Sequence, residues 1–349
     1  MSSLGNRITK SHFFIKLTNW EHWPFGIVQL PSFGHWIWLS LKARSPVFFS
    51  ASNPGIPMGG MFGESKFDIL KRIPGEFIAR SSLVTLPATT REVMRRIHDM
   101  GLVFPVIFKP DLGERGWMVE RIHNETEVDR YLQKIKIDFL IQECIDKPLE
   151  FGVYYRRFPT ENSGVVTSIV AKEMLNVTGN GRSSLQELIQ GKDRARLQWE
   201  KLKIKFESRL DEIPQEGEVI ELVSIGNHCL GTKFLDGGHL INHELTESFD
   251  RISKQVEGFY YGRFDLRVDS IQDLNKGNVK IMELNGCGAE PAHIYQPGYS
   301  LRTALVVLYR HWEDIFRISM ENNKRGVNFT SLKDGIQMYR KFREAVKGS

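Results

Sequence analysis

Acidic and amide side chains recur at alternate positions in two apolar runs in the second half of the sequence. The run YYGRFDLRVDS carries Asp265, and the run VKIMELNGCGAEP carries Glu283 and Asn285. Residues two apart in a strand point to the same face. If the two runs pair across the turn-rich segment IQDLNKGN, two carboxylates and a carboxamide converge on one spot, with Arg263 beside them. Such hard oxygen ligands suit Mg²⁺, and Mn²⁺ accepts similar ones.

The alternative for this pair of runs is a hairpin whose charged face is simply solvated. Two features favour the metal site over it. Each run has apolar residues on its other face, and the glycine loop GCG follows the second run at once. We therefore expect the pair to form the centre of the protein.

A lysine at the end of an apolar run is the second feature that could do chemistry. Lys109 ends the run PVIFKP and directly precedes the glycine-containing loop 111–116. Backbone N–H groups in such a turn, together with a lysine, can neutralise phosphate oxygens. A plain surface lysine is the alternative. The pattern is not a Walker A motif, because no GK[ST] follows, and GESK at 63–66 has the wrong order.

The segment IQECIDKPLEFGVYY is the third feature, because it joins two predicted strands through a short connection. Glu143 and Glu150 flank that connection. An extended segment can offer backbone groups to an adenine edge, and a carboxylate seven residues later can accept hydrogen bonds from ribose hydroxyls. The alternative is an ordinary interdomain linker with exposed acids.

Taken in order, these three features resemble the ATP-grasp superfamily, in particular D-alanine–D-alanine ligase and the ATP-grasp part of cyanophycin synthetase. The segments MLNVTGNGRSSLQELI and GNHCLGTKFLDGGHLINHELT also look like runs in such ligases. The resemblance covers roughly residues 87–301. It implies an α+β (α/β) ATP-grasp fold, in which two α+β subdomains sandwich the nucleotide after an N-terminal pre-ATP-grasp region.

The resemblance also assigns residues to roles. The magnesium ligands would be Asp265, Glu283 and Asn285, and Arg263 and Lys109 would stabilise charge during phosphoryl transfer. The residues implied to bind ATP are Lys109, Gly113, Gly116, Gln142, Glu143, Ile145, Asp146, Glu150 and Lys172, with Lys233 a weaker candidate. Glu114, Arg115 and Trp117 depart from the small residues common in the phosphate loop.

The reaction implied by the resemblance joins a small-molecule carboxylate to an amine or similar nucleophile. In the family the carboxylate attacks the γ-phosphate to give an acyl phosphate and ADP, and the second substrate displaces phosphate. Two alternatives stay open: a small-molecule kinase of the same fold, and a catalytically weak nucleotide-binding or scaffold protein.

The sequence divides into four predicted regions: 1–84, an N-terminal substrate region; 85–149, the small lid subdomain; 150–325, the large subdomain with the metal site; and 326–349, a basic helix. In the first region a glycine-rich loop, with Gly55, Gly59, Gly60 and Gly63, precedes a helix and is a candidate for holding an anionic group. The other candidates for the acceptor pocket are His293, Tyr295 and Arg302.

Composition narrows the functional class. The chain has 349 residues, 41% of them hydrophobic, and 47 Lys and Arg against 42 Asp and Glu, a net charge of +5. The basic excess is spread along the chain without a basic block, which favours anionic small ligands over nucleic acid. The three cysteines form no CxxC pair, and the first 20 residues have no signal-peptide pattern, so a reducing cytoplasmic setting is expected.

An aromatic cluster stands near the N-terminus. Residues 24–41 are almost uncharged, but prolines and glycines interrupt them, so they are not expected to span a membrane. Tryptophans beside basic residues are typical of peripheral contact with a membrane surface, whereas core packing and a homodimer contact are the alternatives. The residues concerned are Trp20, Trp23, Trp36, Trp38, Lys16, Lys42 and Arg44.

Overall fold

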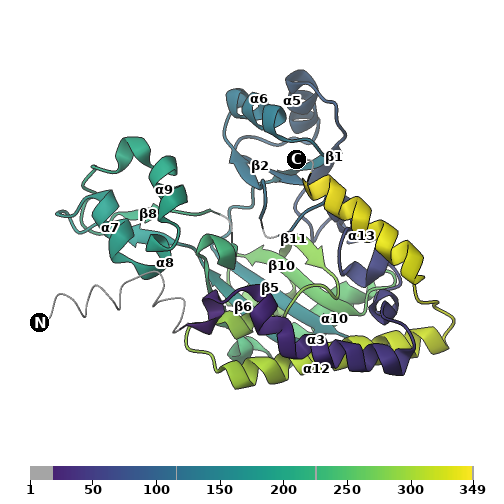
Figure 1. The fold of residues 1–349 in the computed structure, drawn as a ribbon. Helices are drawn as coiled ribbons and strands as arrows, with labels where there is room; N and C mark the ends of the chain where they lie inside the picture. Colours follow the sequence, from purple (N-terminus) through teal and green to yellow (C-terminus); the bar gives the residue numbers. More distant parts are fainter. Residues whose placement is uncertain (1–18, 115, 225, 348–349) are drawn as a thin grey trace, which may run out of the picture. The chain divides into compact units, whose positions relative to one another are not determined.

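The computed structural model describes residues 19–347 except 115 and 225, so Lys16 and Arg115 lie outside the described residues. Its ribbon is drawn in Figure 1. The chain divides into two compact units. The larger one comprises Pro31–Ala171, Asp236–Ile294 and Arg302–Ser349, and the smaller one comprises Met1–Leu30, Lys172–Leu235 and Tyr295–Leu301.

A five-stranded sheet carries the two apolar runs that the sequence singled out. Its order is β11-β10-β5-β6-β9, and β10 is antiparallel to both β5 and β11. The strands are β5 (Leu149–Arg156), β6 (Val165–Glu173), β9 (Lys233–Asp236), β10 (Tyr261–Val268) and β11 (Lys280–Asn285). The predicted pairing of the two runs is therefore present.

The connection between β10 and β11 is a short helix instead of the turn expected from IQDLNKGN. Helix α11 (Ile271–Lys276) begins at Ser270, whose side chain accepts a hydrogen bond from the N–H of Asp273. It ends at Gly277, whose φ of 76° is in the left-handed region that favours glycine. Capping residues at both ends explain why a turn-rich sequence forms a helix.

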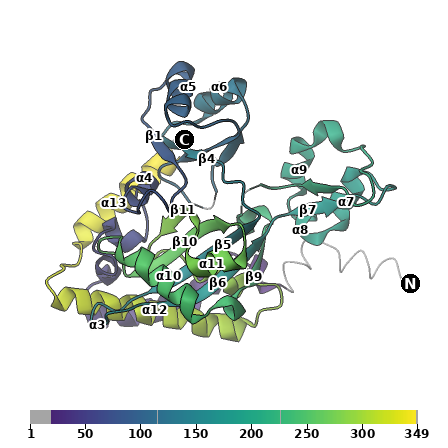
Figure 2. The same ribbon diagram turned by 180° about the vertical axis from the view of Figure 1, so that it is seen from behind.

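Helices cover both faces of the five-stranded sheet. Helix α10 (His243–Lys254) buries Leu245, Phe249 and Ile252, which recur at helical spacing, against one face (Figure 2). On the other face, α3 (Phe25–Ala43) and α12 (Leu301–Lys324) contribute to a second core cluster. Alternate residues of each strand point to opposite faces, so both faces have an apolar core.

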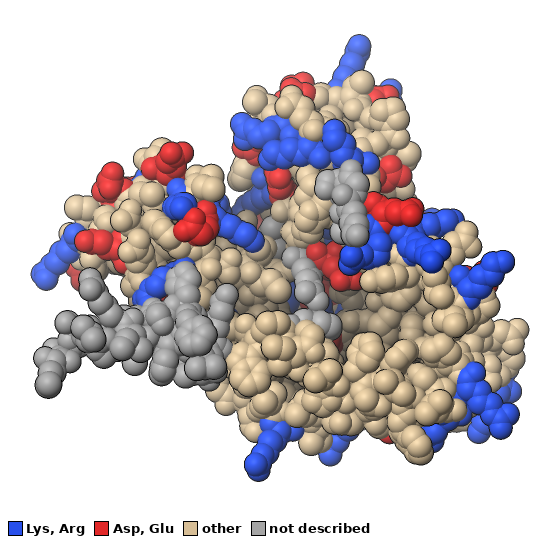
Figure 3. Space-filling model, viewed as in Figure 1, with Lys and Arg blue, Asp and Glu red and all other residues tan. Residues whose placement is uncertain are grey.

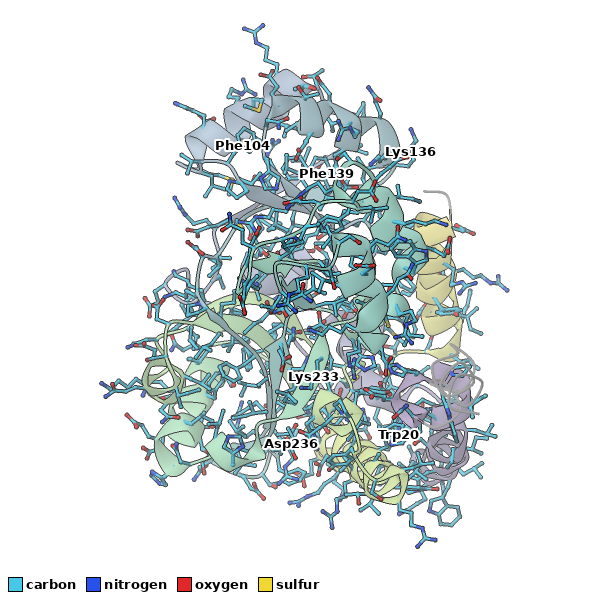
Figure 4. All side chains as sticks on the ribbon, turned by 90° about the vertical axis from the view of Figure 1, so that its left-hand side faces the viewer. Trp20, Phe104, Lys136, Phe139, Lys233 and Asp236 are labelled. Atoms are coloured by element: carbon cyan, nitrogen blue, oxygen red, sulfur yellow. The ribbon has the colours of Figure 1, made fainter. Side chains whose placement is uncertain are left out.

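A four-stranded sheet forms the region expected to be the lid. Its order is β1-β4-β2-β3, all antiparallel. The elements are β1 (Ser81–Val84), α5 (Thr90–Asp99), β2 (Val106–Pro110), β3 (Glu120–Ile122), α6 (Glu125–Lys134) and β4 (Phe139–Glu143). Phe139, labelled in Figure 4, packs with Phe108 and Tyr131 in its core, at centroid distances of 5.1 and 5.2 Å.

The smaller unit has a core of its own around a two-stranded sheet. Its elements are β7 (Asn176–Thr178), α7 (Leu185–Gly191), α8 (Asp193–Arg196), α9 (Trp199–Lys205) and β8 (Val219–Glu221). The larger unit also contains α4 (Lys66–Leu70) and a C-terminal helix, α13 (Leu332–Lys347). The short 3-10 helices are Trp20–His22, Phe48–Ala51, Pro57–Gly60, Glu207–Arg209, His228–Leu230, Gly238–Leu240 and Ala292–Tyr295.

The combination of helices with antiparallel sheets confirms the predicted α+β class. The stretch expected to be too interrupted to cross a membrane forms the 19-residue helix α3 despite Pro31 within it. Among the helices of the described residues, none combines the length and the apolar character that crossing a membrane requires.

Candidate active site

The predicted metal ligands lie together on β10 and β11. In the antiparallel register Asp265 is opposite Glu283 and Arg263 is opposite Asn285. The Nδ2 of Asn285 donates to Oδ2 of Asp265 at 2.9 Å. Nε and Nη2 of Arg263 donate to the same oxygen at 3.2 and 3.0 Å. The strand pairing thus brings all four side chains to one spot, as the sequence predicts.

Gly152 on the neighbouring strand β5 makes room for these side chains. It is opposite Asp265 in the β5–β10 register. A Cβ at this position would lie 3.0 Å from Cδ of Arg263 and 3.2 Å from Oδ1 of Asp265, and 2.8 Å from Cγ1 of Val170. Because real Cβ atoms rarely approach so closely, any larger residue here would displace the site's arginine or carboxylate.

A β-bulge in β11 creates the contact with Lys109. The register passes from Asp265–Glu283 to Leu266–Ile281, which leaves Met282 as an extra residue. The carbonyl of Met282 accepts hydrogen bonds from Nζ of Lys109 at 2.9 Å and from Nε2 of Gln142 at 3.1 Å. Bulges of this kind redirect backbone groups beside functional sites. The bulge therefore joins the four-stranded sheet to β11.

Lys109 is a buried cation beside two carboxylates. Its side chain is 6% exposed, and burial lowers the pKa of its ammonium to about 8, although Glu283 and Asp265 act in the opposite direction. Burying a charged group is unfavourable, and nearby opposite charges offset part of that unfavourable free energy. Lys109 is thus held in a position where anionic oxygen atoms would stabilise it.

A second lysine at the site, Lys66, was missed by the sequence analysis. Its Nζ lies 3.4 Å from Oε1 of Glu283 and also donates to the carbonyl of Gly113 in the predicted phosphate loop. Lys66 is the first residue of α4, directly after the N-cap Ser65. The segment GESK that contains Lys66 does not have the residue order of a Walker A motif. Because this segment begins helix α4, the side chain of Lys66 lies next to Glu283 on β11.

Asp111 fixes the start of α4 against the phosphate loop. One of its carboxylate oxygens, Oδ1, accepts from Oγ of Ser65 at 3.0 Å and from the N–H of Phe67 at 2.9 Å. Its carbonyl accepts from the N–H of Lys66 at 3.2 Å. Asp111 is buried. The loop after β2 and the start of α4 are therefore one connected structure.

The charges around Glu283 keep it ionised. Burial alone would raise the pKa of its carboxyl, but Lys66, then Lys109, and also Arg263 outweigh burial and lower it below the usual value. For Arg263, burial opposes the charge while Asp265 raises the pKa of the guanidinium above its ordinary value. Three cations and two carboxylates thus stabilise one another in a single cluster.

The donor set fits a divalent cation. The hydrogen bonds from Arg263 and Asn285 converge on Oδ2 of Asp265. The side chain of Glu283 is 29% exposed, and its carboxylate forms an ion pair with Lys66. Glu64 is another acid close enough to Glu283 to be affected by its charge. Burial raises the pKa of the Glu64 carboxyl, and Glu283 acts in the same direction. Among the described residues, Oε2 of Glu64 has no hydrogen-bond partner. Oxygen ligands of this kind suit Mg²⁺.

The predicted phosphate loop has the glycine conformations that a tight loop requires. The φ values are 143° at Gly113 and 71° at Gly116, both in the region that favours glycine. A Cβ at Gly113 would lie 3.3 Å from Cε3 of Trp117. The departure from a small residue at 117 is therefore accommodated by the glycine at 113.

The two acids expected at adenine and ribose pair with arginines. Glu143 and Arg80 form a two-pronged ion pair, with Oε1 2.9 Å from Nη2 and Oε2 3.2 Å from Nε. Oε2 of Glu150 accepts from Nε of Arg267 at 2.9 Å. Arg267 also donates from Nη1 to the carbonyl of Ile145 at 3.1 Å. Arg80 and Arg267 thus contact the predicted adenine and ribose segment from other parts of the chain.

The remaining predicted residues lie in different surroundings. Gln142 is buried and its amide donates to Ser81 as well as to Met282. Asp146 is exposed beyond the end of β4. Lys172 on β6 and Lys233 on β9 both belong to the smaller unit, and Nζ of Lys233 is 3.3 Å from Oε2 of Glu173.

The N-terminal glycine loop packs against the loop that follows β11. The carbonyl of Gly59 accepts from the N–H of Cys287 at 3.0 Å, and that of Gly60 accepts from the N–H of Gly288 at 2.9 Å. A Cβ at Gly60 would lie 2.7 Å from Cα of Gly286. These glycines permit close backbone contact, which fixes the loop that follows β11.

Comparison with known proteins gives structural matches only. No protein-family model matches the sequence, and no curated protein matches it. Solved structures match with probability 1.00. The D-alanine–D-alanine ligase of Bacillus anthracis complexed with ATP is 13% identical, with a TM-score of 0.41, over 78% of this chain and 71% of that one.

Two further solved structures match at similarly low identity and TM-score. The ATP-grasp ligase PsnB, complexed with a minimal precursor, is 14% identical with a TM-score of 0.36, over 70% of this chain and 60% of that one. A bifunctional glutathione synthetase from Pasteurella multocida is also 14% identical with a TM-score of 0.36; the match covers 70% of this chain but only 36% of the synthetase. At such low identities and TM-scores, the roles of residues follow from the chemistry of this chain's own side chains.

Proposed function

We propose that this protein is an ATP-dependent ligase that phosphorylates a carboxylate and transfers the activated acyl group to an amine or similar nucleophile. The observation that carries the proposal is the convergence of Asp265, Glu283 and Asn285 with the cations of Lys66, Lys109 and Arg263. A merely solvated hairpin would place such charges in water instead of burying Lys109 and Asp265.

The acids and the amide of this cluster would hold Mg²⁺, or Mn²⁺ in its place. A bound Mg²⁺ neutralises charge on the β- and γ-phosphates of ATP. Lys109 and Lys66 would contact the phosphate oxygens from the side of the lid sheet and α4. Arg263 would stabilise the negative charge that develops on the acyl adduct. Charge neutralisation and positioning are the main requirements of phosphoryl transfer.

The proposed reaction has two steps. An oxygen of the substrate carboxylate attacks the γ-phosphorus, the bond from phosphorus to the bridging oxygen of ADP breaks, and an acyl phosphate forms. The nucleophile then attacks the acyl carbon, the carbon–oxygen bond to phosphate breaks, and a proton leaves the amine. No covalent protein nucleophile is needed. Burial raises the pKa of the Cys287 thiol to about 12, which leaves this cysteine unsuited to such a role.

The proposed nucleotide site of the larger unit extends from Lys109, Gly113 and Gly116 to the segment 142–146 and Glu150. Strand β4 has a neighbouring strand on each side near its end: Gln142 pairs with Ser81 of β1, and Glu143 pairs with Val106 of β2. Its ladder positions are thus used within the sheet, and the backbone beyond its end offers the groups for an adenine edge. Glu150 would share its carboxylate between Arg267 and a ribose hydroxyl.

The four-part division of the chain belongs to this proposal. Residues 85–149 would act as the lid, 150–325 as the large subdomain with the metal site, and 1–84 with 326–349 as the surrounding segments. The glycine loop of the first region would shape the substrate pocket by fixing the loop 286–288. The substrates are a small-molecule carboxylate and an amine or similar nucleophile.

The test is MgATP-dependent formation of ADP and phosphate by the purified protein with pooled carboxylates and amines. Turnover that needs both pools, and that Glu283→Gln abolishes, supports the ligase. Glu247→Gln, an exposed acid on α10, is the matched control and should keep full activity. With a carboxylate labelled with ¹⁸O, the label must appear in the released phosphate.

Two outcomes would replace the proposal. A stable phosphorylated product without use of an amine would identify a kinase. Bound ATP without turnover in any pool would identify a nucleotide-binding protein, in agreement with the unusual residues Glu114 and Trp117 of the phosphate loop. Lack of label in phosphate, with turnover intact, would exclude the acyl-phosphate step.

A further inference from the structure

Helix α3 has one face in the core and the opposite face exposed. Val28, Ser32, Leu39 and Ala43 recur at helical spacing and are buried. This side contributes Leu39 and Ala43 to the core cluster that also contains Ile315 and Ile318 of α12. The helix is therefore fixed along its inner side.

The exposed face of α3 is apolar. Its members recur at spacings of three and four residues, so they form one stripe opposite the buried one. They are Ile27, Leu30, Phe33, Ile37, Trp38 and Leu41. Leu30 and Leu41 are 72% and 69% exposed. An amphipathic helix of a water-exposed surface has polar residues here, so this stripe indicates a partner.

Helix α12 extends this apolar face. Val306 and Tyr309 are exposed, and the hydroxyl of Tyr309 donates to the carbonyl of Pro31 at 3.3 Å, which places the two helices side by side. In Figure 3 the surface over α3 and α12 is a broad area free of charged side chains, with Lys and Arg at its margins. We call this surface the α3–α12 face.

Along α3 the charged residues beside the α3–α12 face are basic, and α12 carries both a basic and an acidic residue. Between Glu21 and Glu64 the sequence has no Asp or Glu, and its basic residues there are Lys42 and Arg44, both exposed. On α12, Arg310 is exposed, while Oε1 of Glu313 lies 2.9 Å from Nε2 of His35. A basic margin around an apolar stripe complements a surface that is apolar inside and anionic outside.

We propose that the α3–α12 face docks on an anionic lipid bilayer surface, with α3 in the plane of the interface. Trp38 and Phe33 would insert at the level of the headgroups, and Lys42, Arg44 and Arg310 would contact lipid phosphates. A second copy of the chain is the main competing occupant. Helix α3 contains no acid to pair with the basic margin of such a copy, and Glu313 of α12 already lies against His35 of its own chain, so the charge pattern favours lipid.

The experiment is co-sedimentation of the full chain with vesicles of phosphatidylcholine, alone or mixed in equal parts with phosphatidylglycerol. We expect binding to the mixed vesicles, and weaker binding by about tenfold or more without the anionic lipid, because each basic residue near the surface contributes about fivefold in affinity. Leu30→Glu/Trp38→Glu should lose binding to both. Lys42→Glu/Arg310→Glu should lose only the preference for anionic lipid.

Val103→Glu/Ile204→Glu is the matched control, because both residues are exposed large hydrophobics outside this face. It should bind like the wild type. Equal thermal unfolding of all variants shows that the fold is intact. The proposal is overturned if the wild type does not sediment with either vesicle, or if the control variant loses binding as fully as Leu30→Glu/Trp38→Glu. Light scattering that shows a dimer broken by the latter variant, without vesicle binding, would identify a second copy as the occupant.

Discussion

Lys109→Met should stabilise the protein while it removes the proposed activity. Lys109 is buried, and its ammonium has a pKa of about 8 instead of 10.5. Methionine has nearly the same length and no charge to desolvate. The carbonyl of Met282 keeps a partner in the variant, because Nε2 of Gln142 still donates to it at 3.1 Å. The substitution therefore leaves no buried carbonyl without a hydrogen bond.

The size of the effect follows from the pKa. A lowering from 10.5 to about 8, at about 1.4 kcal/mol for each tenfold change, means that the charged form is disfavoured by about 3 kcal/mol in the folded state. Glu283 loses an opposite charge in the variant, which offsets part of this gain. We expect the free energy of unfolding at pH 7 to rise by about 1–3 kcal/mol.

The gain must depend on pH in one direction. Below pH 8 the lysine is charged in both the folded and the unfolded chain, so the wild type bears the full cost of burial. Between pH 8 and 10.5 the folded chain releases its proton first, so the wild type gains stability relative to the variant as pH rises. The difference between the two proteins should therefore be largest at neutral pH and vanish near pH 10.5.

Urea unfolding at several pH values, with ATP turnover measured in parallel, checks this prediction. Lys201→Met, at an exposed position on α9, is the control and should change the free energy of unfolding by less than about 0.5 kcal/mol. A loss of stability in Lys109→Met at neutral pH would refute the reasoning, because it would make Lys109 a structural residue. Unchanged turnover would refute its role in the site.

Three further substitutions test other contacts of the site. Lys66→Gln removes the cation that does most to lower the pKa of Glu283, so the acid limb of Mg²⁺-dependent ATP binding should move to higher pH, as calorimetry would show. Gly152→Ala should reduce kcat/KM by about 100-fold or more, since its Cβ would lie 3.0 Å from Arg263. Asn53→Ala should lower the free energy of unfolding by about 2–4 kcal/mol in urea, because this buried amide makes four hydrogen bonds to backbone groups, among them those of Tyr261.

Each of these substitutions has a matched control. Lys71→Gln changes an exposed lysine of the α4 region, Gly191→Ala adds a Cβ with nothing within 4 Å, and Asn278→Ala removes an exposed amide. All three should behave like the wild type. An unmoved acid limb in Lys66→Gln, full activity in Gly152→Ala, or wild-type stability in Asn53→Ala would each contradict the corresponding contact.

The sequence was sufficient to predict the pairing of the two runs that carry the predicted metal ligands. Alternation of polar and apolar residues placed Asp265, Glu283 and Asn285 on one face, and the structure brings them together in register. Lys109 was predicted on a different ground, because it stands at the end of a clear apolar run before a glycine-containing loop. Such predictions succeed where residues close in sequence share one strand or one turn.

The contacts that the sequence could not reveal join distant segments. Lys66 reaches Glu283 only because α4 begins at Ser65 and Asp111 holds that start. The bulge at Met282 leaves no mark in the alternation of side chains. The arginine partners of Glu143 and Glu150 were missed for a similar reason, since opposite charges far apart in sequence give no periodic signal.

The exposed side of α3 shows a different limit. Its apolar residues are visible in the sequence, but the prolines and glycines at 24, 26, 31 and 34 argued against a membrane-spanning helix, and no shorter helix was predicted there. Packing of Leu39 and Ala43 against the core overrides that local preference. Only with the helix in place does the outer stripe become apparent.

The most direct test of the central claim is calorimetric titration of the purified protein with ATP, with and without Mg²⁺, for the wild type, Glu283→Gln and the control Glu247→Gln. The account predicts that Mg²⁺ strengthens ATP binding to the wild type and the control by about tenfold or more, and that Glu283→Gln loses this gain. If ATP bound equally well with and without Mg²⁺, or if Glu283→Gln kept the full gain, the carboxylate cluster on β10 and β11 would not be a metal–nucleotide site.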